Sequence, residues 1–554
     1  MEKNNLETLE KIVQFIYDSE PKTKVRFDDA RRKICSKLKI SQPANNALLP
    51  VYHKMLKNQI LKKDTNFEFL LRKANIRTLS GVAVVTSLAK PFVCPGKCIY
   101  CPNENNMPKS YIASEPAAAR ALALKFSPYE QMKKRIEMLE KNGHPTDKIE
   151  FIIKGGSWNS YDIKYQYWFI LESFKACNDF KRRKKLGESK ISDWKNLSDL
   201  EKALQKEQNY NETANHRIIG LTLETRPDLI NPENIYHMRR QGSTRIELGL
   251  QATDDKILQL NKRGHTLAGF KQAILLLRQA GFKVDLHFMP ALFGSNPKKD
   301  VKMYQEIFSD PGLKPDMIKI YPCVVTKNTE LYKLYNEKKY KPYSEKQLFE
   351  SIIEMKTNTP RYCRISRLIR DIPNQEIIAG NSVTNLRENL QKEMKKRNLI
   401  CNCLRCREIG HNLSLLNKNL KPKLFIDEYQ TIGGLEYFLS FEDKNRQVVF
   451  AFLRLRIPDS KENNSVTKLL TEIKSTAFIR ELHTYGQLMK IGITNTEKGQ
   501  HRGLGKKLLL TAEKIVKRKK FDKIAIISGV GVRNYYTKNG YQKKGTYMIK
   551  KLVS

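Results

Sequence analysis

Three cysteines near residue 100 have a spacing that suits a metal cluster. Cys94, Cys98 and Cys101 form a C-x-x-x-C-x-x-C pattern, with three thiols within eight residues. A 4Fe–4S cube ligated only by protein takes four cysteines, so a set of three leaves one iron open to another ligand. The alternatives are a zinc site, which needs a fourth ligand nearby, and three unrelated buried thiols. The strict spacing favours the cluster.

An open iron can chelate the amino and carboxylate groups of S-adenosylmethionine and pass it an electron, which releases a 5′-deoxyadenosyl radical. The cysteine spacing resembles that of the radical S-adenosylmethionine superfamily. This interpretation assigns Cys94, Cys98 and Cys101 to a 4Fe–4S cluster and Tyr100 to the S-adenosylmethionine site. It also requires an electron donor as a partner.

The overall composition indicates a large, basic protein. A chain of 554 residues is too long for one core, so we expect two or three domains. The 101 Lys and Arg residues outnumber the 58 Asp and Glu residues, for a formal net charge of +43. This excess predicts a polyanionic partner, most plausibly nucleic acid, although a generally basic proteome is an alternative.

The sequence shows no signal-peptide layout and no apolar run near the roughly 20 residues that span a bilayer. We therefore expect a cytoplasmic protein without a membrane partner. Its 10 cysteines are then interpreted as metal ligands or buried thiols and not as disulfides.

Residues 1–75 are expected to form a basic helical segment that binds RNA. From residue 20 to residue 73 there are 14 Lys and Arg but only 5 Asp and Glu residues. Such a patch neutralises phosphates without reading sequence. The alternative is an ordinary solvated helix surface. The residues predicted to contact RNA are Arg31, Arg32, Lys33, Lys37 and Lys39.

Strand-like and helix-like stretches alternate over residues 76–400. Repeated βα units imply a parallel sheet, so the fold class is α/β with a complete or partial (β/α) barrel. Chemistry in such folds lies in the loops after the strands. The expected strands are 81–88, 149–153, 218–223, 245–250, 283–288 and 317–321.

Several residues follow or end these strands and are candidates for binding S-adenosylmethionine. Gly155 and Gly156 follow the second strand, where glycine lets the backbone approach a ligand closely. Glu224 follows the third strand, and Glu247 and Gln251 belong to the fourth strand and its exit. Each carboxylate alone is equally compatible with a structural ion pair or a cap.

Residues 422–554 change to hairpin-like strands, which predicts an α+β domain. A Q-x-x-G-x-G motif then opens a helix over 506–517. Its glycines expose backbone N–H groups at a helix N-terminus, where the dipole favours an anion. The motif resembles the coenzyme A pyrophosphate site of GNAT acetyltransferases. Its predicted contacts are Gln500, Arg502, Gly503, Leu504, Gly505 and Lys506.

A second cysteine group lies between these two parts, in a linker over 401–421. Cys401, Cys403 and Cys406 form a C-x-C-x-x-C pattern that suits a structural zinc. Either Cys363 or His411 is a candidate fourth ligand. A second iron–sulfur cluster is the alternative.

The motifs together resemble the catalytic subunit of Elongator, a radical S-adenosylmethionine enzyme fused to a GNAT domain. The resemblance implies modification of the tRNA wobble uridine to 5-carboxymethyluridine with acetyl-CoA as substrate. It leaves open whether accessory Elongator subunits are needed. The motifs lie at 78–85, 94–102, 220–228, 244–251, 261–265, 281–284, 370–373 and 406–410.

The resemblance also implies residues for acetyl-CoA. Lys148 and Tyr535 are expected to be catalytic and to contact acetyl-CoA. Tyr535 as a packed aromatic and His483 as a structural residue remain alternatives. The sequence departs from the family's pattern at 102–111, which lacks a Gly-Gly, and at Ser243 and Ala291. The other residues expected to contact acetyl-CoA are Glu481, Leu482, His483, Thr484 and Tyr536.

Two other function classes compete with this hypothesis. A protein lysine acetyltransferase would use only the GNAT half, with the iron–sulfur cluster as a structural element. A non-catalytic RNA-binding scaffold would explain the positive charge alone. An open iron is unnecessary in either case, so the cysteine spacing favours the uridine-modifying enzyme.

Overall fold

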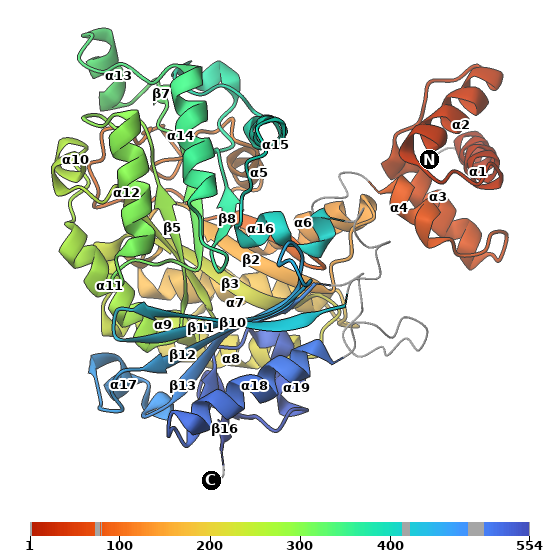
Figure 1. Cartoon of the computed structure of the whole chain (residues 1–554). Helices are drawn as coiled ribbons and strands as arrows, with labels where there is room; N and C mark the ends of the chain where they lie inside the picture. Colours follow the sequence, from red (N-terminus) through yellow and green to blue (C-terminus); the bar gives the residue numbers. More distant parts are fainter. Residues whose placement is uncertain (1–2, 73–77, 79, 413–420, 486–502, 553–554) are drawn as a thin grey trace.

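The computed structural model describes residues 3–72, 78, 80–412, 421–485 and 503–552. A small helical body at the N-terminus stands beside a large body that contains two sheets (Figure 1). In the part of the chain described, no helix combines the length and apolarity needed to cross a bilayer.

The N-terminal body has its own hydrophobic core, in which Phe27, Leu48, Tyr52 and Phe67 are buried. Local capping defines its helix starts, because side-chain oxygens satisfy backbone N–H groups that a helix leaves free. Asp64, for example, accepts from the backbone of the first turn that follows it. The helices are α1 (Lys3–Asp18), α2 (Lys24–Lys37), α3 (Asn45–Lys57) and α4 (Thr65–Leu71).

The first sheet is a parallel half-barrel. Its seven strands follow one another in sequence order, and every neighbouring pair is parallel. The first and last strands are edges, so the barrel is partial, and the predicted α/β class is confirmed. The strands are β1 (Ala83–Leu88), β2 (Lys148–Lys154), β3 (Arg217–Thr225), β4 (Arg245–Gln251), β5 (Lys283–Phe288), β6 (Met317–Ile320) and β8 (Arg364–Arg367).

Helices cover the outer face of this sheet (Figure 1). Two of them, α9 and α12, begin with an Asn cap, Asn231 or Asn296, followed by proline at the first helical position, because proline has no N–H to leave unpaired. A short β7 (Val325–Thr326) pairs with β9 (Ile377–Ala379). The helices are α5 (Pro116–Ala123), α6 (Pro128–Lys141), α7 (Ile163–Asp179), α8 (Leu197–Asn211), α9 (Pro232–Arg240), α10 (Asp255–Leu260), α11 (Leu267–Gln279), α12 (Pro297–Ser309), α13 (Glu330–Asn336), α14 (Glu345–Thr357) and α15 (Leu386–Lys396).

The second sheet follows a short α16 (Leu404–Arg407) and has the order β10-β11-β12-β13-β14-β16-β15. All neighbours are antiparallel except β13 and β14, which run parallel around α18. The elements are β10 (Lys423–Thr431), β11 (Gly434–Glu442), β12 (Val449–Pro458), α17 (Ser465–Leu469), β13 (Ala477–Thr484), α18 (Leu504–Arg518), β14 (Lys523–Ile526), α19 (Arg533–Thr537), β15 (Gln542–Lys544) and β16 (Tyr547–Lys551).

Buried ion pairs join the two sheets. Arg480 on β13 donates to both carboxylate oxygens of Asp316, just before β6, at 2.6 Å. Arg278 on α11 lies 2.8 Å from Glu436 on β11. These side chains are essentially inaccessible to solvent. Removing one partner of such a buried pair typically costs about 3–5 kcal/mol. The second sheet is therefore held against the N-terminal ends of the barrel strands.

Candidate active site between the two sheets

One cavity of about 3280 Å³ runs between the barrel strands and the second sheet. The N-terminal body contributes to its wall through His53, Lys63 and Arg72. Gln500 and Arg502 lie outside the described residues. The predicted site residues on the wall are Cys94, Cys98, Tyr100, Cys101, Lys148, Gly156, Glu224, Glu247, Gln251, Glu481, Leu482, His483, Thr484, Gly503, Leu504, Gly505, Lys506, Tyr535 and Tyr536.

The cysteine loop follows β1 and faces this cavity. Arg263 Nη1 lies 3.4 Å from the sulfur of Cys98, and Arg226 Nη1 lies 3.9 Å from it. A hydrogen bond from Cys101 and the charge of Arg263 lower the pKa of Cys98 to about 4, against the effect of burial. Thiolates are the form that binds iron. Three thiols on a large cavity wall, beside two buried cations, fit an iron–sulfur cluster that shares the space with a nucleoside.

The two glycines after β2 have different surroundings. Gly155 has a φ of 134°, and a Cβ there would lie 3.0 Å from the Ala89 side chain. A glycine is therefore required at position 155 because the chain packs closely against the end of β1. Gly155 is not part of the cavity wall. Gly156, with a φ of 92°, does line the cavity. Only the second glycine is positioned for a close approach to a ligand.

A buried cluster of charged groups forms the middle of the wall. Glu247 is completely buried and pairs with both Lys154 and Lys319, while His287 Nε2 lies 3.4 Å away. Lys154 also lies 3.1 Å from Glu224. Burial raises the pKa of Glu247, but the charges of Lys154 and Lys319 outweigh this and hold it well below its usual range. The cluster keeps two lysines ordered inside the barrel.

Sequence reasoning missed the three basic members of this cluster. Lys154 ends β2, His287 lies near the end of β5, and Lys319 lies within β6. The clearest signal in the sequence was Lys319, a charged residue in the otherwise apolar strand β6. That signal alone does not say that the three side chains meet, because they come from strands far apart in the chain.

Several buried polar atoms on the cavity wall have no hydrogen-bond partner among the described residues. They include the hydroxyl of Tyr100, Oε1 of Glu247 and Oε1 of Gln251. Gln251 also has a φ of 74°, a conformation that costs energy for a residue with a side chain. Buried polar groups are normally paired, so unpartnered ones on a cavity wall indicate a polar ligand.

The far end of the cavity is built by β13 and its neighbours. Glu481 accepts from Arg454 at 2.8 Å and lies 3.5 Å from Lys283. Burial raises its pKa, but these two charges lower it to about 2. His483 stacks on Phe452, and burial lowers its pKa to about 4. At neutral pH His483 is therefore an uncharged imidazole, and its Nε2 has no partner in the described part of the chain.

The start of α18 is shaped by its glycines. Gly503 adopts the left-handed conformation, with a φ of 82°, directly before the helix. A Cβ at Gly505 would lie 2.7 Å from the hydroxyl of Tyr535, so any larger residue would displace that tyrosine. The rings of Tyr535 and Tyr536 pack edge to face at 5.3 Å. The first N–H groups of α18 thus face the cavity beside an ordered tyrosine, as an anion site requires.

Lys148 lies at the opposite end of β2 from Gly156, roughly 20 Å away along a strand of seven residues. Its partner in the sheet register is Arg217, which packs closely against Gly531 of the second domain. Burial lowers the pKa of Lys148. Lys148 therefore lies at the end of β2 that packs against the second sheet, away from the cysteine loop.

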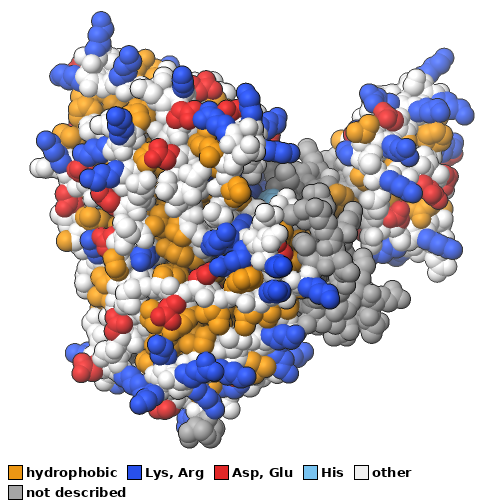
Figure 2. Space-filling view, in the orientation of Figure 1, with side chains coloured by type: hydrophobic (Ala, Val, Ile, Leu, Met, Phe, Trp, Pro, Cys, Tyr) orange, Lys and Arg blue, Asp and Glu red, His pale blue; other side chains and the backbone are white. Residues whose placement is uncertain are grey.

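The predicted RNA contacts lie on and just after α2. Arg31 is half-buried and bonded to Asp28 and Asn45 at 2.8 Å each, and Arg32 pairs with Asp29. The other three, Lys33, Lys37 and Lys39, are exposed. Lysine and arginine side chains are spread over the visible face of the N-terminal body (Figure 2).

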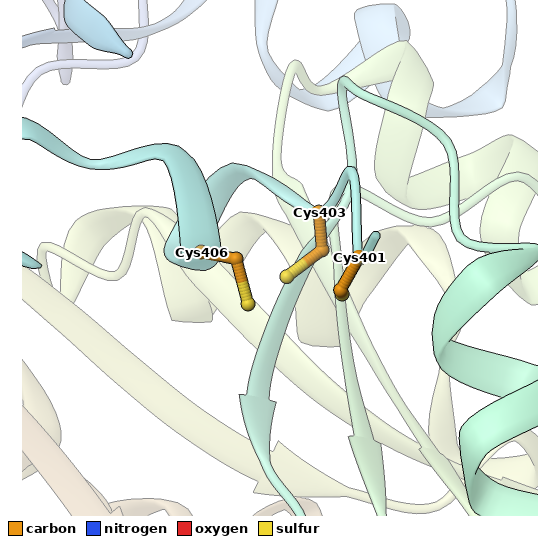
Figure 3. A group of neighbouring side chains, drawn as sticks. All are labelled: Cys401, Cys403 and Cys406. Carbon is orange, nitrogen blue, oxygen red and sulfur yellow. The ribbon is translucent and has the colours of Figure 1, made fainter. Parts of the chain in front are cut away.

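The second cysteine group forms a compact centre outside the cavity wall (Figure 3). The sulfurs of Cys401, Cys403 and Cys406 all lie within 4.8 Å of one another. A tetrahedral zinc with bonds of about 2.3 Å puts its sulfurs roughly 3.8 Å apart. The spacing therefore fits a single metal ion better than a four-iron cube. Neither Cys363 nor His411 belongs to this group.

Comparisons with known proteins agree with this geometry. The chain is 43% identical to a tRNA uridine(34) acetyltransferase of Methanocaldococcus jannaschii over 87% of each chain. It is 33% identical to Elongator complex protein 3 of Saccharomyces cerevisiae over 87% of this chain and 85% of that one. The chain belongs to this family.

The solved structure of an archaeal Elp3 from Methanocaldococcus infernus, with an N-terminal deletion, also resembles the chain. It has 39% sequence identity and a TM-score of 0.69, covering 85% of this chain and 100% of that one. Residues 91–307 match the radical SAM superfamily, and residues 315–396 match the Radical_SAM C-terminal domain. The first of these spans includes the cysteine loop and strands β2 to β5 of the Elp3-like half-barrel.

Proposed function

We propose that this protein modifies the wobble uridine of tRNA and builds 5-carboxymethyluridine from acetyl-CoA. In this reaction the acetyl methyl loses a hydrogen atom to the deoxyadenosyl radical, and the resulting carbon radical adds to C5 of the uridine. C5 then releases its hydrogen as a proton while one electron passes to a redox partner, and water hydrolyses the thioester. The observation that carries the proposal is the single cavity that joins the cysteine loop to the start of α18. Relatives named tRNA uridine(34) acetyltransferase support the choice of substrate.

Residues at one end of the cavity would hold the radical-generating group. Cys94, Cys98 and Cys101 would ligate a 4Fe–4S cluster, which together with S-adenosylmethionine supplies a 5′-deoxyadenosyl radical when bound. Gly156 and Gln251 offer a close backbone approach and an unpartnered polar atom for S-adenosylmethionine. The nearby cations Arg226 and Arg263 favour the thiolate form of Cys98.

Glu224 and the Glu247 cluster have a supporting role on the same wall. Tyr111 donates to Glu224 at 2.9 Å, and Lys154 bridges Glu224 to Glu247. A buried carboxylate with these partners stays ionised and holds Lys154 and Lys319 in place. The two ammonium groups are balanced by the two carboxylates, so the cluster gives the middle of the cavity ordered polar groups without an excess of positive charge.

Residues at the other end would bind acetyl-CoA. The N–H groups at the start of α18 suit the pyrophosphate, and Lys506 adds a positive charge beside them. Tyr535 and Lys148 line the approach to the thioester. His483, neutral at pH 7 with a free Nε2, is suited to take a proton from the water that hydrolyses the thioester.

The net charge of +43 and the exposed Lys33, Lys37 and Lys39 support binding of the tRNA backbone. His53, Lys63 and Arg72 bring the N-terminal body to the cavity wall, where an anticodon loop would enter. We assign a structural zinc to Cys401, Cys403 and Cys406. Binding of tRNA should weaken steeply with salt, because phosphate contacts release counterions.

An anaerobic assay tests the proposal directly. The cluster is reconstituted, and S-adenosylmethionine, dithionite, acetyl-CoA and bulk tRNA are added. The tRNA is then digested to nucleosides, and their masses are measured by mass spectrometry. We expect 5′-deoxyadenosine and a nucleoside with the mass of carboxymethyluridine. Acetylated protein lysines without a modified nucleoside would instead identify a lysine acetyltransferase.

A further inference from the structure

The cysteine loop has two sides with different surroundings. Cys94, Gly96 and Cys98 line the cavity, and a side chain at Gly96 would collide with the guanidinium of Arg226. The residues that alternate with them are exposed and do not belong to the cavity wall. We call this exposed side the outer face of the loop, and it consists of Lys90, Pro91, Phe92, Val93, Pro95 and Lys97.

The centre of the outer face is apolar and held in place. Val93 is 79% exposed, more than any other large apolar side chain of the described residues, and Phe92 is 44% exposed. The Phe92 ring stacks on Tyr161 at 5.0 Å, and Tyr161 stacks on Tyr165 at 5.2 Å. The hydroxyl of Tyr161 donates to the backbone oxygen of Lys90 at 2.7 Å. An ordered apolar surface loses little entropy when a partner binds, so this face suits a protein contact.

Lysines flank this apolar centre. Lys90 and Lys97 are exposed, and the stretch from residue 90 to residue 98 contains no Asp or Glu. On the border of the face, Glu330 pairs with Lys262 at 2.5 Å, and Asp162 accepts from the backbone at the start of α7. The outer face therefore combines an apolar centre with a positively charged rim, which is complementary to an acidic protein surface.

The proposed chemistry needs an electron at this loop. Cleavage of S-adenosylmethionine consumes one electron and breaks the bond between sulfur and the 5′ carbon. The added electron and one bonding electron become the lone pair of methionine, and the other bonding electron stays on the 5′ carbon. Val93 directly precedes Cys94, with Cα atoms about 3.8 Å apart. A donor seated on Val93 would thus reach the cluster position without entering the cavity that the substrates occupy.

We propose that the outer face of the loop is the docking surface of a small acidic electron-carrier protein with a flavin or an iron–sulfur centre. The reduced carrier loses one electron for each S-adenosylmethionine cleaved. Contacts between redox partners are small, below about 1,200 Å² in total, which suits a face of this size. The inference rests on the proposed function and names the partner that supplies its electron.

The activity test compares two electron sources. The rate of 5′-deoxyadenosine formation per bound cluster is measured with dithionite, and again with NADPH, flavodoxin reductase and a flavodoxin held below saturation. Val93→Glu should match the unmodified protein with dithionite. It should be slower by about tenfold or more with flavodoxin, because it sets a negative charge against an acidic partner. Val93→Lys should keep the flavodoxin-driven rate. The control is Ile426→Glu, a 46% exposed apolar residue on β10, which should change neither rate.

Binding is measured separately from turnover. Titration calorimetry at low salt gives the affinity of each cluster-loaded variant for flavodoxin, and the same titrations are repeated with a ferredoxin. Val93→Glu should weaken binding by about tenfold or more. Lys90→Gln and Lys97→Gln should each weaken it by about two- to fivefold, since exposed charges contribute modestly. The effect of these two changes should shrink at high salt, which screens exposed charges.

Four results would overturn the proposal. The first is an equal flavodoxin-driven rate in Val93→Glu and Ile426→Glu. The second is a slow dithionite-driven rate in Val93→Glu, which would show that Val93 supports the cluster itself. The third is an unmodified protein that works with dithionite but accepts electrons from neither flavodoxin nor ferredoxin. The fourth is a loss of tRNA binding in Val93→Glu with unchanged flavodoxin binding, which would identify an RNA surface.

Failure of the proposed function has a different signature. A protein that forms 5′-deoxyadenosine with flavodoxin but no carboxymethyluridine would keep the docking surface and reject the uridine chemistry. Carboxymethyluridine formed with dithionite, together with a flavodoxin-driven rate that Val93→Glu leaves unchanged, would keep the function and reject the surface.

Discussion

The two cysteine triplets of this chain have the same number of thiols but different surroundings. Cys94, Cys98 and Cys101 lie on a loop that faces a cavity of about 3280 Å³. The sulfurs of the triplet at 401–406 all lie within 4.8 Å of one another, and none of the three residues lines that cavity. The buried cations Arg226 and Arg263 lie beside Cys98 of the first triplet.

This difference separates a reactive site from a structural one. A four-iron cube and a nucleoside need space, and the first triplet has it. A single ion needs converging ligands in a closed setting, which the second triplet provides. The number of cysteines therefore carries less information than the volume and charge around them, and the following predictions test that contrast.

The largest effect is expected when a ligand of the loop triplet is removed. Cys98→Ala should abolish 5′-deoxyadenosine formation and uridine modification, while the zinc content stays unchanged. Two cysteines cannot replace three around the cluster. Iron content and product mass are measured together. The control is Cys177→Ala, a buried thiol on α7 that is part of neither triplet. Radical cleavage that persists in Cys98→Ala would contradict the assignment of the loop.

Removing a ligand of the second triplet should lower the stability of the protein and leave the radical chemistry intact. Cys403→Ser should lose zinc and melt at a lower temperature, because a metal that binds only the folded state stabilises it. Iron content and the release of 5′-deoxyadenosine should remain. Metal analysis and calorimetry check this prediction. A simultaneous loss of iron would show that the two centres are not independent.

A smaller effect is expected from the cation beside Cys98. Arg263→Gln removes a charge 3.4 Å from the sulfur, so the pKa of Cys98 should rise from about 4. In the protein without its cluster, alkylation of Cys98 at pH 6 should slow once this pKa passes the assay pH, by about tenfold for each further unit. Mass spectrometry measures the rate. Lys262→Gln, an exposed neighbour, should have no effect on it.

The smallest effect concerns acid stability near the same loop. Burial and the charges of Arg263 and Arg226 lower the pKa of His265 to about 3. The neutral imidazole therefore contributes stability that is present above the unfolded pKa of about 6.5 and is lost as pH falls toward 3. His265→Gln should give a shallower fall in melting temperature between pH 6.5 and 4. Parallel curves would show that His265 does not contribute.

Most of the strands and both cysteine groups were predictable because local pattern determines them. Residues 149–153, 218–223 and 245–250 are short stretches rich in Ile and Leu, and they lie within β2, β3 and β4. The anion site at Gly503 and Gly505 was predictable in the same way, since glycines at this spacing before an amphipathic helix are typical of a phosphate-binding turn. The resemblance to a known family supplied the roles that pattern alone did not, such as that of Lys148.

The contacts between distant strands were not predictable in the same way. Nothing local marks Lys319 as a partner of Glu247, or Arg480 as a partner of Asp316. Gly155 was expected at the ligand, yet its neighbour Ala89 gives it a packing role. These outcomes depend on which strands lie side by side.

The amino-acid sequence by itself determined the alternation of strands and helices, the ligand spacing of each cysteine group and the excess of positive charge. Those features depend on residue type and on neighbours a few positions away. Only the tertiary structure decided that one cavity joins the cysteine loop to the start of α18, and that Arg480 is buried against Asp316. The physical reason is that burial and electrostatic pairing arise when segments far apart in the chain pack together and exclude water.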